Sequence, residues 1–360
     1  AVALTLIFNA LGGIQNAKLT IAIDFKTRAK ISLMCTISTG IIGLIMAYKG
    51  YGVWALVTQN IANSILNATL LWLFVRWIPQ RTFSMQSFRQ LFGFGSKLLA
   101  SGLLDTIYNN IYPLVIGKFF SASTLGVYSR ASSLAQYPSS NLTSVLQSVT
   151  FPVLSSIQND EERLGNAYRR LLRMSVFIIF PLMIGLSAVA DPFIRLVLTD
   201  KWEGAIYLLQ IVCFSMMWYP VHAINLNLLQ VKGRSDYFLK LEIIKKIIGV
   251  SMLCITVPIG IVAMCYGSIC TSIICLGVNT HYTWKLIGYG FKRQKREMLP
   301  TLLHALVMGA IAWTAVQLLP TIESQLIGGI LSGATYYIIG AWLLKFKELQ
   351  EVVSLIKRKK

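Results

Sequence analysis

Seven charged side chains lie inside long apolar stretches of this 360-residue sequence rather than in the charged connections between them. Five are basic and two are acidic, namely Lys18, Lys97, Arg130, Lys245, Lys246, Asp105 and Glu242. A charge at membrane depth costs a few kcal/mol or more, so such a group usually faces a partner or a water-filled cavity. The excess of bases over acids therefore favours an anionic ligand such as a phosphate group.

Arg130 heads a polar stripe on the segment from 124 to 156. Five side chains fall within about 40° of one line when a helix turns about 100° per residue: Arg130, Tyr137, Asn141, Ser144 and Ser148. Gln147 lies about 100° from that line and is left out. Because a guanidinium offers fixed, paired donors to phosphate oxygens, Arg130 is the best single candidate for a phosphate contact. The whole stripe predicts a cavity wall, although a single Ser or Thr more often only joins helices.

Other predicted helices also carry polar faces. Helical spacing groups Ser101, Asp105, Asn109 and Tyr112 on 94–118; Thr5, Asn9, Asn16 and Thr20 on 1–23; Asn60, Asn63, Ser64 and Asn67 on 52–75; and Trp218, His222 and Asn225 on 203–231. Amides suit sugar hydroxyls, and aromatic rings suit apolar sugar faces. The candidate substrate-binding set is Arg130, Lys97, Asp105, Asn109, Tyr137, Asn141, Ser148, Lys245 and Lys246.

Structural roles compete with these binding roles. Arg130 could pair with Asp105, because the helical rise places them at depths about 5 Å apart. Glu242 can pair along its own helix with Lys245 or Lys246, three and four residues on, and these lysines could equally snorkel to the interface. The histidines lack metal-binding spacing, and a lone histidine in a helix is more often a hydrogen-bonded packing residue. No C-x-x-C pair occurs, so we expect neither a metal nor a cofactor.

Membrane-spanning helices must position these residues. The chain is 55% hydrophobic and 13% charged, whereas roughly a quarter of a soluble domain is charged. A spanning helix needs roughly 20 apolar residues. Eleven such segments are predicted, at 1–23, 30–48, 52–75, 94–118, 124–156, 168–196, 203–231, 237–257, 260–287, 299–319 and 323–345. The expected fold class is an all-α integral membrane bundle.

The basic residues of the connections fall almost entirely on one side. Alternate connections and the C-terminal tail hold nearly all of them, whereas the opposite set holds only Lys49, Lys118, Arg195 and Lys201. By the positive-inside rule, the basic set and the C-terminus are cytoplasmic. The net charge of +19 is therefore a topology signal, and nucleic-acid binding is not expected.

A weak internal repeat indicates two related bundles. The stretch from Asn16 to Ala55 resembles that from Asn225 to Ala263, and two repeated bundles with a site between them are a common transporter plan. The predicted parts are the last three helices of a first lobe (1–75), a cytoplasmic linker (76–93), a six-helix second lobe (94–287), two added helices (288–345) and a basic tail (346–360). We therefore expect an N-terminally truncated chain, with about 115 residues and three helices before Ala1.

One block of the sequence resembles a known family. It contains Ile116-Gly117-Lys118-Phe119-Phe120, Leu125-Gly126-Val127-Tyr128-Ser129-Arg130-Ala131, Pro138 and Phe151-Pro152-Val153-Leu154-Ser155. Gly52-Val53-Trp54-Ala55, Phe180-Pro181, Lys201-Trp202 and Gly233-Arg234 fit the same pattern, while Ser121 stands where the family often has glycine. In these residues the chain is similar to the polysaccharide exporters. These are O-antigen and colanic-acid type flippases of the multidrug/oligosaccharidyl-lipid/polysaccharide exporter superfamily.

The resemblance implies a MATE-like, two-lobed bundle of about fourteen spanning helices, of which this chain would hold about eleven. It implies a flippase that moves undecaprenyl-pyrophosphate-linked oligosaccharide across the bacterial inner membrane by alternating access. The expected partners are that lipid-linked oligosaccharide and the bilayer, with a proton or sodium left open as a coupling ion. In the expected mechanism, Arg130 with Lys97 and Lys245 or Lys246 neutralises pyrophosphate in a cavity between the lobes, beside a sugar path of Tyr137, Asn141, Ser148 and Asn109.

Two other functions stay open as alternatives. A drug or metabolite exporter of the same superfamily would bind cations through intramembrane acids, which the two deep acids against five deep bases disfavour. A membrane polymerase or ligase acting on lipid-linked glycans would need a sizeable extramembrane loop, and the predicted outer loops are short. The sequence contains no Walker loop and no G-x-S-x-G motif, so we expect a transporter rather than an enzyme.

Overall fold

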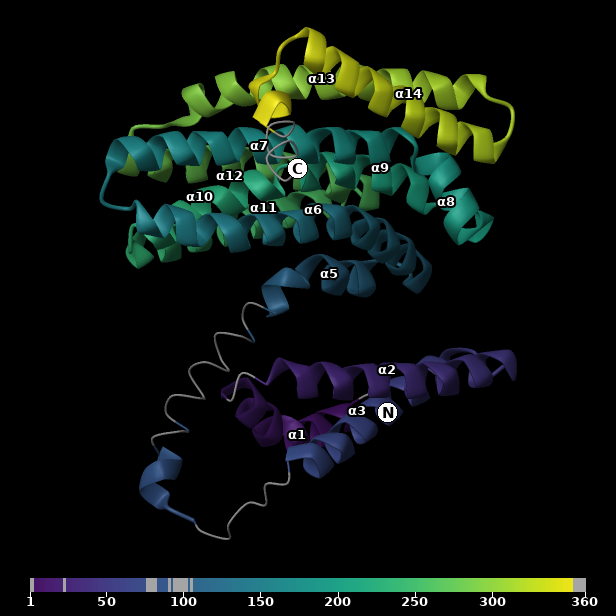
Figure 1. Cartoon of the computed structure of the whole chain (residues 1–360). Helices are drawn as coiled ribbons and strands as arrows, with labels where there is room; N and C mark the ends of the chain where they lie inside the picture. The colour runs from purple at the N-terminus through teal and green to yellow at the C-terminus, as the bar shows by residue number, and fades with distance from the viewer. Residues whose placement is uncertain are drawn as a thin grey trace. The chain divides into compact units, whose positions relative to one another are not determined.

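The computed structural model describes residues 3–21, 24–75, 83–89, 92, 103 and 106–351. Two compact units are present, residues 1–97 and 98–360 (Figure 1). In the described ranges all regular structure is helical, which confirms the all-α class. Six of these helical segments are long and apolar enough to cross a membrane: Lys26–Tyr48, Glu161–Ala188, Ala205–Val231, Ile261–Ile287, Phe291–Leu318 and Ile322–Leu343.

The first unit is built from α1 (Leu4–Ile21), α2 (Phe25–Tyr48) and α3 (Val53–Val75), and α3 packs against both other helices. The helix α2 begins where Asp24 accepts a hydrogen bond from the Thr27 backbone N–H at 3.0 Å, which is a side-chain cap. Gly50 and Gly52, between α2 and α3, have φ of +82° and +53°. Only glycine adopts such angles without strain, so this pair permits the tight turn.

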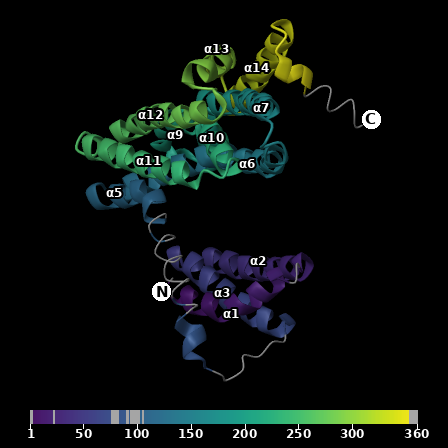
Figure 2. The same ribbon diagram turned by 90° about the vertical axis from the view of Figure 1, so that its left-hand side faces the viewer.

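The second unit contains helices α5 to α14 (Figure 2). They are α5 (Ile111–Phe119), α6 (Ala122–Ser156), α7 (Glu161–Ala188), α8 (Ala190–Leu198), α9 (Ala205–Met216), α10 (Tyr219–Val231), α11 (Ser235–Thr256), α12 (Ile261–Ile287), α13 (Phe291–Leu318) and α14 (Ile322–Leu343). The helices α13 and α14 pack on each other, and α13 packs on α7. The described residues of each predicted apolar segment in this unit thus fall mainly on helix, but two of the segments are not continuous.

The predicted helices 168–196 and 203–231 are both interrupted. The first divides into α7 and α8 at Val189, and the second divides into α9 and α10 after Met216. In the second case the cause is Pro220, because proline lacks an N–H and its ring excludes the carbonyl four residues earlier. That carbonyl belongs to Met216, and it instead accepts a hydrogen bond from the Ser139 hydroxyl of α6 at 2.7 Å.

Pro181, inside the C-terminal third of α7, frees another backbone carbonyl. The carbonyl of Phe177, four residues earlier, accepts a hydrogen bond from the Tyr337 hydroxyl of α14 at 2.8 Å. An unsatisfied buried acceptor is costly, most of all in a membrane. The added helix α14 therefore stabilises the proline site of α7.

Removing this hydroxyl tests that interpretation. We expect Tyr337→Phe to lower the free energy of unfolding by about 1–3 kcal/mol, because the Phe177 carbonyl then stays buried without a donor. Tyr336→Phe on the same helix is the matched control and should change it by less than about 0.5 kcal/mol. The measurement is unfolding of the purified protein in mixed detergent micelles, and equal effects of the two substitutions would contradict the assignment.

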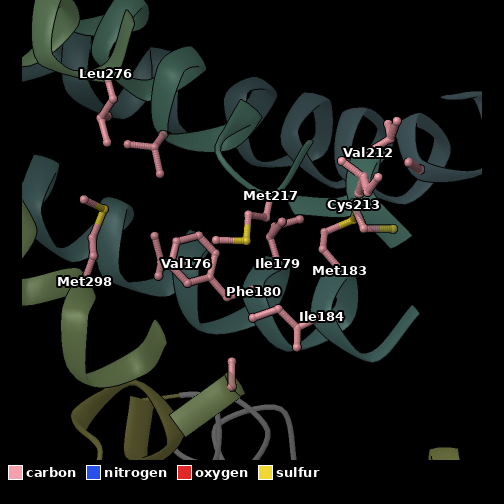
Figure 3. Close-up of a cluster of buried hydrophobic side chains, with 14 of the residues drawn as sticks. Val176, Ile179, Phe180, Met183, Ile184, Val212, Cys213, Met217, Leu276 and Met298 are labelled. Atoms are coloured by element: carbon pink, nitrogen blue, oxygen red, sulfur yellow. The ribbon is translucent and has the colours of Figure 1, made fainter. Parts of the chain in front are cut away.

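The apolar core of the second unit gathers around α7 (Figure 3). Phe180 and Met183 are fully buried there, and the Phe180 ring packs edge-on against Trp218 with centroids 5.2 Å apart. At the contact between α7 and α13, a Cβ on Gly309 would clash with the Ile184 side chain. Small residues allow such close approach of membrane helices, so α13 is held directly against the core.

Candidate functional site

The polar stripe predicted on α6 lies on the exposed face of that helix. Arg130, Tyr137, Asn141 and Ser144 are all exposed, Tyr137 to 64%. The opposite face carries Ala131, Ala135, Ser139 and Thr143, which are buried where α6 packs on α9 and α10. The side chain of Ser148 lies outside the described part of the chain.

Gln147, which was left out of the stripe, has a packing role. Its amide donates to the Asn227 side-chain oxygen of α10 at 3.2 Å. This polar contact joins two helices, as polar residues in membrane proteins often do. The placement of residues at about 100° per residue therefore distinguished the exposed face of α6 from the face that packs on neighbouring helices.

Arg130 lies against an aromatic ring. Its guanidinium carbon is 4.8 Å from the centroid of Trp202, in the short 3₁₀ helix η1 (Asp200–Trp202) between α8 and α9. The attraction of a cation to a ring face is electrostatic and consumes none of the N–H donors. Trp202 therefore holds the guanidinium in place and leaves its donors available for an anion. The alternative partner, Asp105, lies outside the described residues.

The ring of Trp202 belongs to a connection fixed by ion pairs. Arg195 binds three carboxylates, with nitrogen–oxygen distances of 2.8 Å to Asp191, 3.0 Å to Asp200 and 2.7 Å to Glu203. Hydrogen bonds to these carboxylates raise the pKa of Arg195, so it stays charged at every accessible pH. No site role was predicted for Trp202, because Arg130 and Trp202 are far apart along the chain.

The other predicted bases form a separate group on α11. The Lys245 ammonium lies 2.6 Å from the Glu242 carboxylate, which confirms the predicted pairing along the helix. The Lys246 ammonium lies 5.3 Å from the ring centroid of Tyr108, whose hydroxyl donates to the Lys245 carbonyl at 3.3 Å. Asn109, which follows Tyr108 in the sequence, is exposed. Lys97, like Asp105, is outside the described ranges.

His222 and His304 are packing residues, as expected. The two ring nitrogens of His222 lie 3.0 Å from the Ser272 hydroxyl and 2.8 Å from the Asn279 amide. His304 lies 3.0 Å from the Tyr337 carbonyl. These contacts join α10 to α12 and α13 to α14.

The first unit contains a small polar cavity of about 210 Å³. Three of the asparagines predicted on polar faces, Asn16, Asn63 and Asn67, line it together with Arg28 and Ser32. The polar faces of α1 and α3 thus open on a shared space. Lys18 is exposed and is not among the lining residues.

Comparison with known proteins supports the resemblance seen in the sequence. A family model described as "Polysaccharide biosynthesis protein" matches residues 1–207. The chain is 30% identical to the lipopolysaccharide biosynthesis protein WzxC of Escherichia coli (strain K12), over 51% of this chain and 38% of that protein. It is 26% identical to the teichuronic acid biosynthesis protein TuaB of Bacillus subtilis (strain 168), over 59% and 45%. The match thus spans less than half the length of these two relatives.

Two further matches cover nearly all of this chain. The succinoglycan biosynthesis transport protein ExoT of Rhizobium meliloti (strain 1021) is 22% identical over 97% of this chain and 72% of that protein. The solved structure of the lipid II flippase MurJ, in its inward closed conformation, aligns with a TM-score of 0.74 and 16% identity. It covers 95% of this chain and 72% of that one, and it establishes the shared fold. Since the family model matches more than half of the sequence, this chain belongs to the polysaccharide biosynthesis protein family.

Proposed function

We propose that the protein moves polyprenyl-pyrophosphate-linked oligosaccharide across the bacterial inner membrane by alternating access. The observation that carries the proposal is the polar face of α6, where Arg130, Tyr137, Asn141 and Ser144 are exposed on a helix otherwise packed into an apolar unit. Exposed polar groups are unfavourable against lipid tails and favourable in a wet path. Relatives named for lipopolysaccharide biosynthesis and succinoglycan transport support the same class of cargo.

In the proposed mechanism, Arg130 receives the pyrophosphate of the carrier lipid. Its contact with Trp202 orients the guanidinium before cargo arrives, which reduces the entropy lost on binding. Tyr137 and Asn141 then offer a ring and an amide to the sugars. Lys246 lies beside the Tyr108 ring and adds a base on α11. Lys245 of the same helix is paired with Glu242 and contributes little net charge.

The proposed orientation places the connections rich in Lys and Arg, and the C-terminus, in the cytoplasm. Four exposed residues in the connections and helix ends give a direct test: Lys49, Lys201, Arg163 and Arg293. In a cysteine-free background, Lys49→Cys and Lys201→Cys should react with an impermeant thiol reagent added to whole cells. Arg163→Cys and Arg293→Cys should react only after permeabilisation, and the reverse pattern would overturn the orientation.

Restoration of glycan export tests the function itself. We expect the full-length protein that carries this chain to restore surface glycan in a strain that lacks its own flippase but makes the lipid-linked precursor. Restored export with unchanged precursor synthesis supports a flippase. Accumulation of unexported precursor despite normal protein levels in the membrane would contradict the proposal.

A further inference from the structure

A second basic site lies in the second unit, on elements other than α6. A pocket of about 580 Å³ is lined by Arg169 of α7, by Tyr289 between α12 and α13, and by Arg293, Arg296 and Glu297 of α13. The helices α7 and α13 pack side by side (Figure 1). Three guanidinium groups thus share one pocket with a single carboxylate, so the pocket carries a net positive charge.

Contacts with neighbouring groups hold several of the residues that line the pocket. Tyr289 is only 1% exposed, and its ring packs edge-on against Tyr168 with centroids 5.8 Å apart. The Arg169 guanidinium carbon lies 4.8 Å from the Tyr289 ring centroid, and an Arg293 terminal nitrogen donates to the Gly288 carbonyl at 3.3 Å. These contacts hold two of the three guanidinium groups without neutralising them.

Neighbouring arginines of α7 differ in this respect. Arg170 lies 2.8 Å from Glu351, and Arg173 lies 3.2 Å from Glu348, so carboxylates that follow α14 compensate both. Within the described residues no ion pair is found for Arg169, and its buried Nε has no hydrogen-bond partner. The buried Nε of Arg173 also lacks a hydrogen bond, but Glu348 compensates its charge. A buried donor normally has a partner, and the missing acceptor for Arg169 would come from a bound anion.

Two further polar groups define the ligand more closely. The Tyr289 hydroxyl and the Glu297 carboxylate interact in the pocket, because burial, followed by a hydrogen bond with Glu297, raises the pKa of Tyr289. The buried Glu297 Oε2 atom keeps a lone pair that can accept a further hydrogen bond from a ligand hydroxyl. Arginine pairs match the oxygens of a phosphate group. The ligand chemistry is therefore a phosphate with an adjacent hydroxyl.

The position of the pocket favours a lipid as the source of that phosphate. Arg293 and Arg296 lie in the first two turns of α13, and the long apolar part of that helix begins at about Leu299. Basic residues at such a boundary lie at the depth of lipid headgroups. We propose that this pocket binds the headgroup of an anionic, hydroxylated phospholipid such as phosphatidylglycerol. By the orientation proposed above, this headgroup would belong to the cytoplasmic leaflet; the rest of the argument does not depend on that orientation.

Binding of short-chain lipids to the purified, delipidated protein tests the assignment. Native mass spectrometry with dioctanoyl phosphatidylglycerol should show one tightly bound lipid and clear preference over dioctanoyl phosphatidylcholine. Arg293→Gln with Arg296→Gln should weaken that binding by roughly tenfold or more, the factor expected for losing a hydrogen bond to a charged group. Replacement of both by Lys should restore only part of it, because the paired donor geometry is lost.

The matched control removes the same charge from the same segment. Lys292→Gln with Lys295→Gln changes two exposed lysines that do not line the pocket, and it should leave the affinity within about twofold if the site is specific. Equal weakening by both double substitutions would reduce the effect to diffuse surface attraction and overturn the site. Displacement of the lipid by millimolar inorganic phosphate, or no preference over phosphatidylcholine, would overturn the lipid assignment. None of these binding measurements depends on transport, so their outcome is independent of the glycan-export test.

Discussion

Arg130→Ala should reduce export of the lipid-linked glycan by roughly tenfold or more, because a hydrogen bond to a charged group contributes about 1.5–3 kcal/mol. Arg130→Lys should retain the charge over Trp202 but lose the paired donors, so it should recover only part of the export. The measurement is surface glycan in the flippase-null strain, normalised to the amount of protein in the membrane. Arg163→Ala, which removes an arginine that is 79% exposed in the first turn of α7, is the control and should export normally.

Two further substitutions separate the cargo role of Arg130 from structural ones. Trp202→Ala should lower export less than Arg130→Ala, because the guanidinium keeps its donors and loses only its support. Normal export by Arg130→Ala would remove Arg130 from the mechanism. If Asp105→Asn restored export to Arg130→Ala, the arginine would be half of an ion pair and not a phosphate ligand.

The largest loss of stability is expected at Phe180. Its side chain is fully buried between α7 and its neighbours and packs against Trp218. We expect Phe180→Ala to lower the free energy of unfolding by about 3–5 kcal/mol, since it removes the ring contacts and leaves a cavity. Unfolding in mixed detergent micelles, followed by near-ultraviolet circular dichroism of the aromatic core, measures the change.

Phe119 provides the matched control. It is 64% exposed at the end of α5, so Phe119→Ala removes the same atoms from a site with little packing. We expect a change within about 0.5 kcal/mol. Equal losses at the two positions would show that the packed core around α7 does not determine the stability of the second unit.

Hydropathy located the helices because each spanning element is a long apolar run that must satisfy its own backbone hydrogen bonds. It could not find the interruptions at Val189 and Met216, because most of the side chains around both breaks are apolar. Pro220 gave a local signal for the second break. The hydroxyls that compensate the freed carbonyls come from Ser139 and Tyr337, which are distant in sequence, so only the folded chain reveals them.

Some features of the candidate site could likewise be predicted from the sequence and others could not. The stripe on α6 was predictable because one uninterrupted helix carries it, so a fixed angle per residue sufficed. The pair of Lys245 with Glu242 was predictable because it is local. The contact of Arg130 with Trp202 depends on how α6 meets the connection after α8, and no pattern along the chain encodes that meeting. The binding roles themselves stay predictions.

The most direct test of the account is whether the polar face of α6 is wet and carries cargo. In a cysteine-free background, Asn141→Cys is compared with Leu331→Cys, a position 61% exposed among the apolar residues of α14. The rate of reaction with a small, membrane-impermeant thiol reagent is measured in proteoliposomes with and without lipid-linked oligosaccharide. The account predicts rapid reaction at position 141, slowed by the cargo, and almost none at 331. Reaction at 141 that is as slow as at 331 would place this face of α6 against lipid and contradict the proposed path.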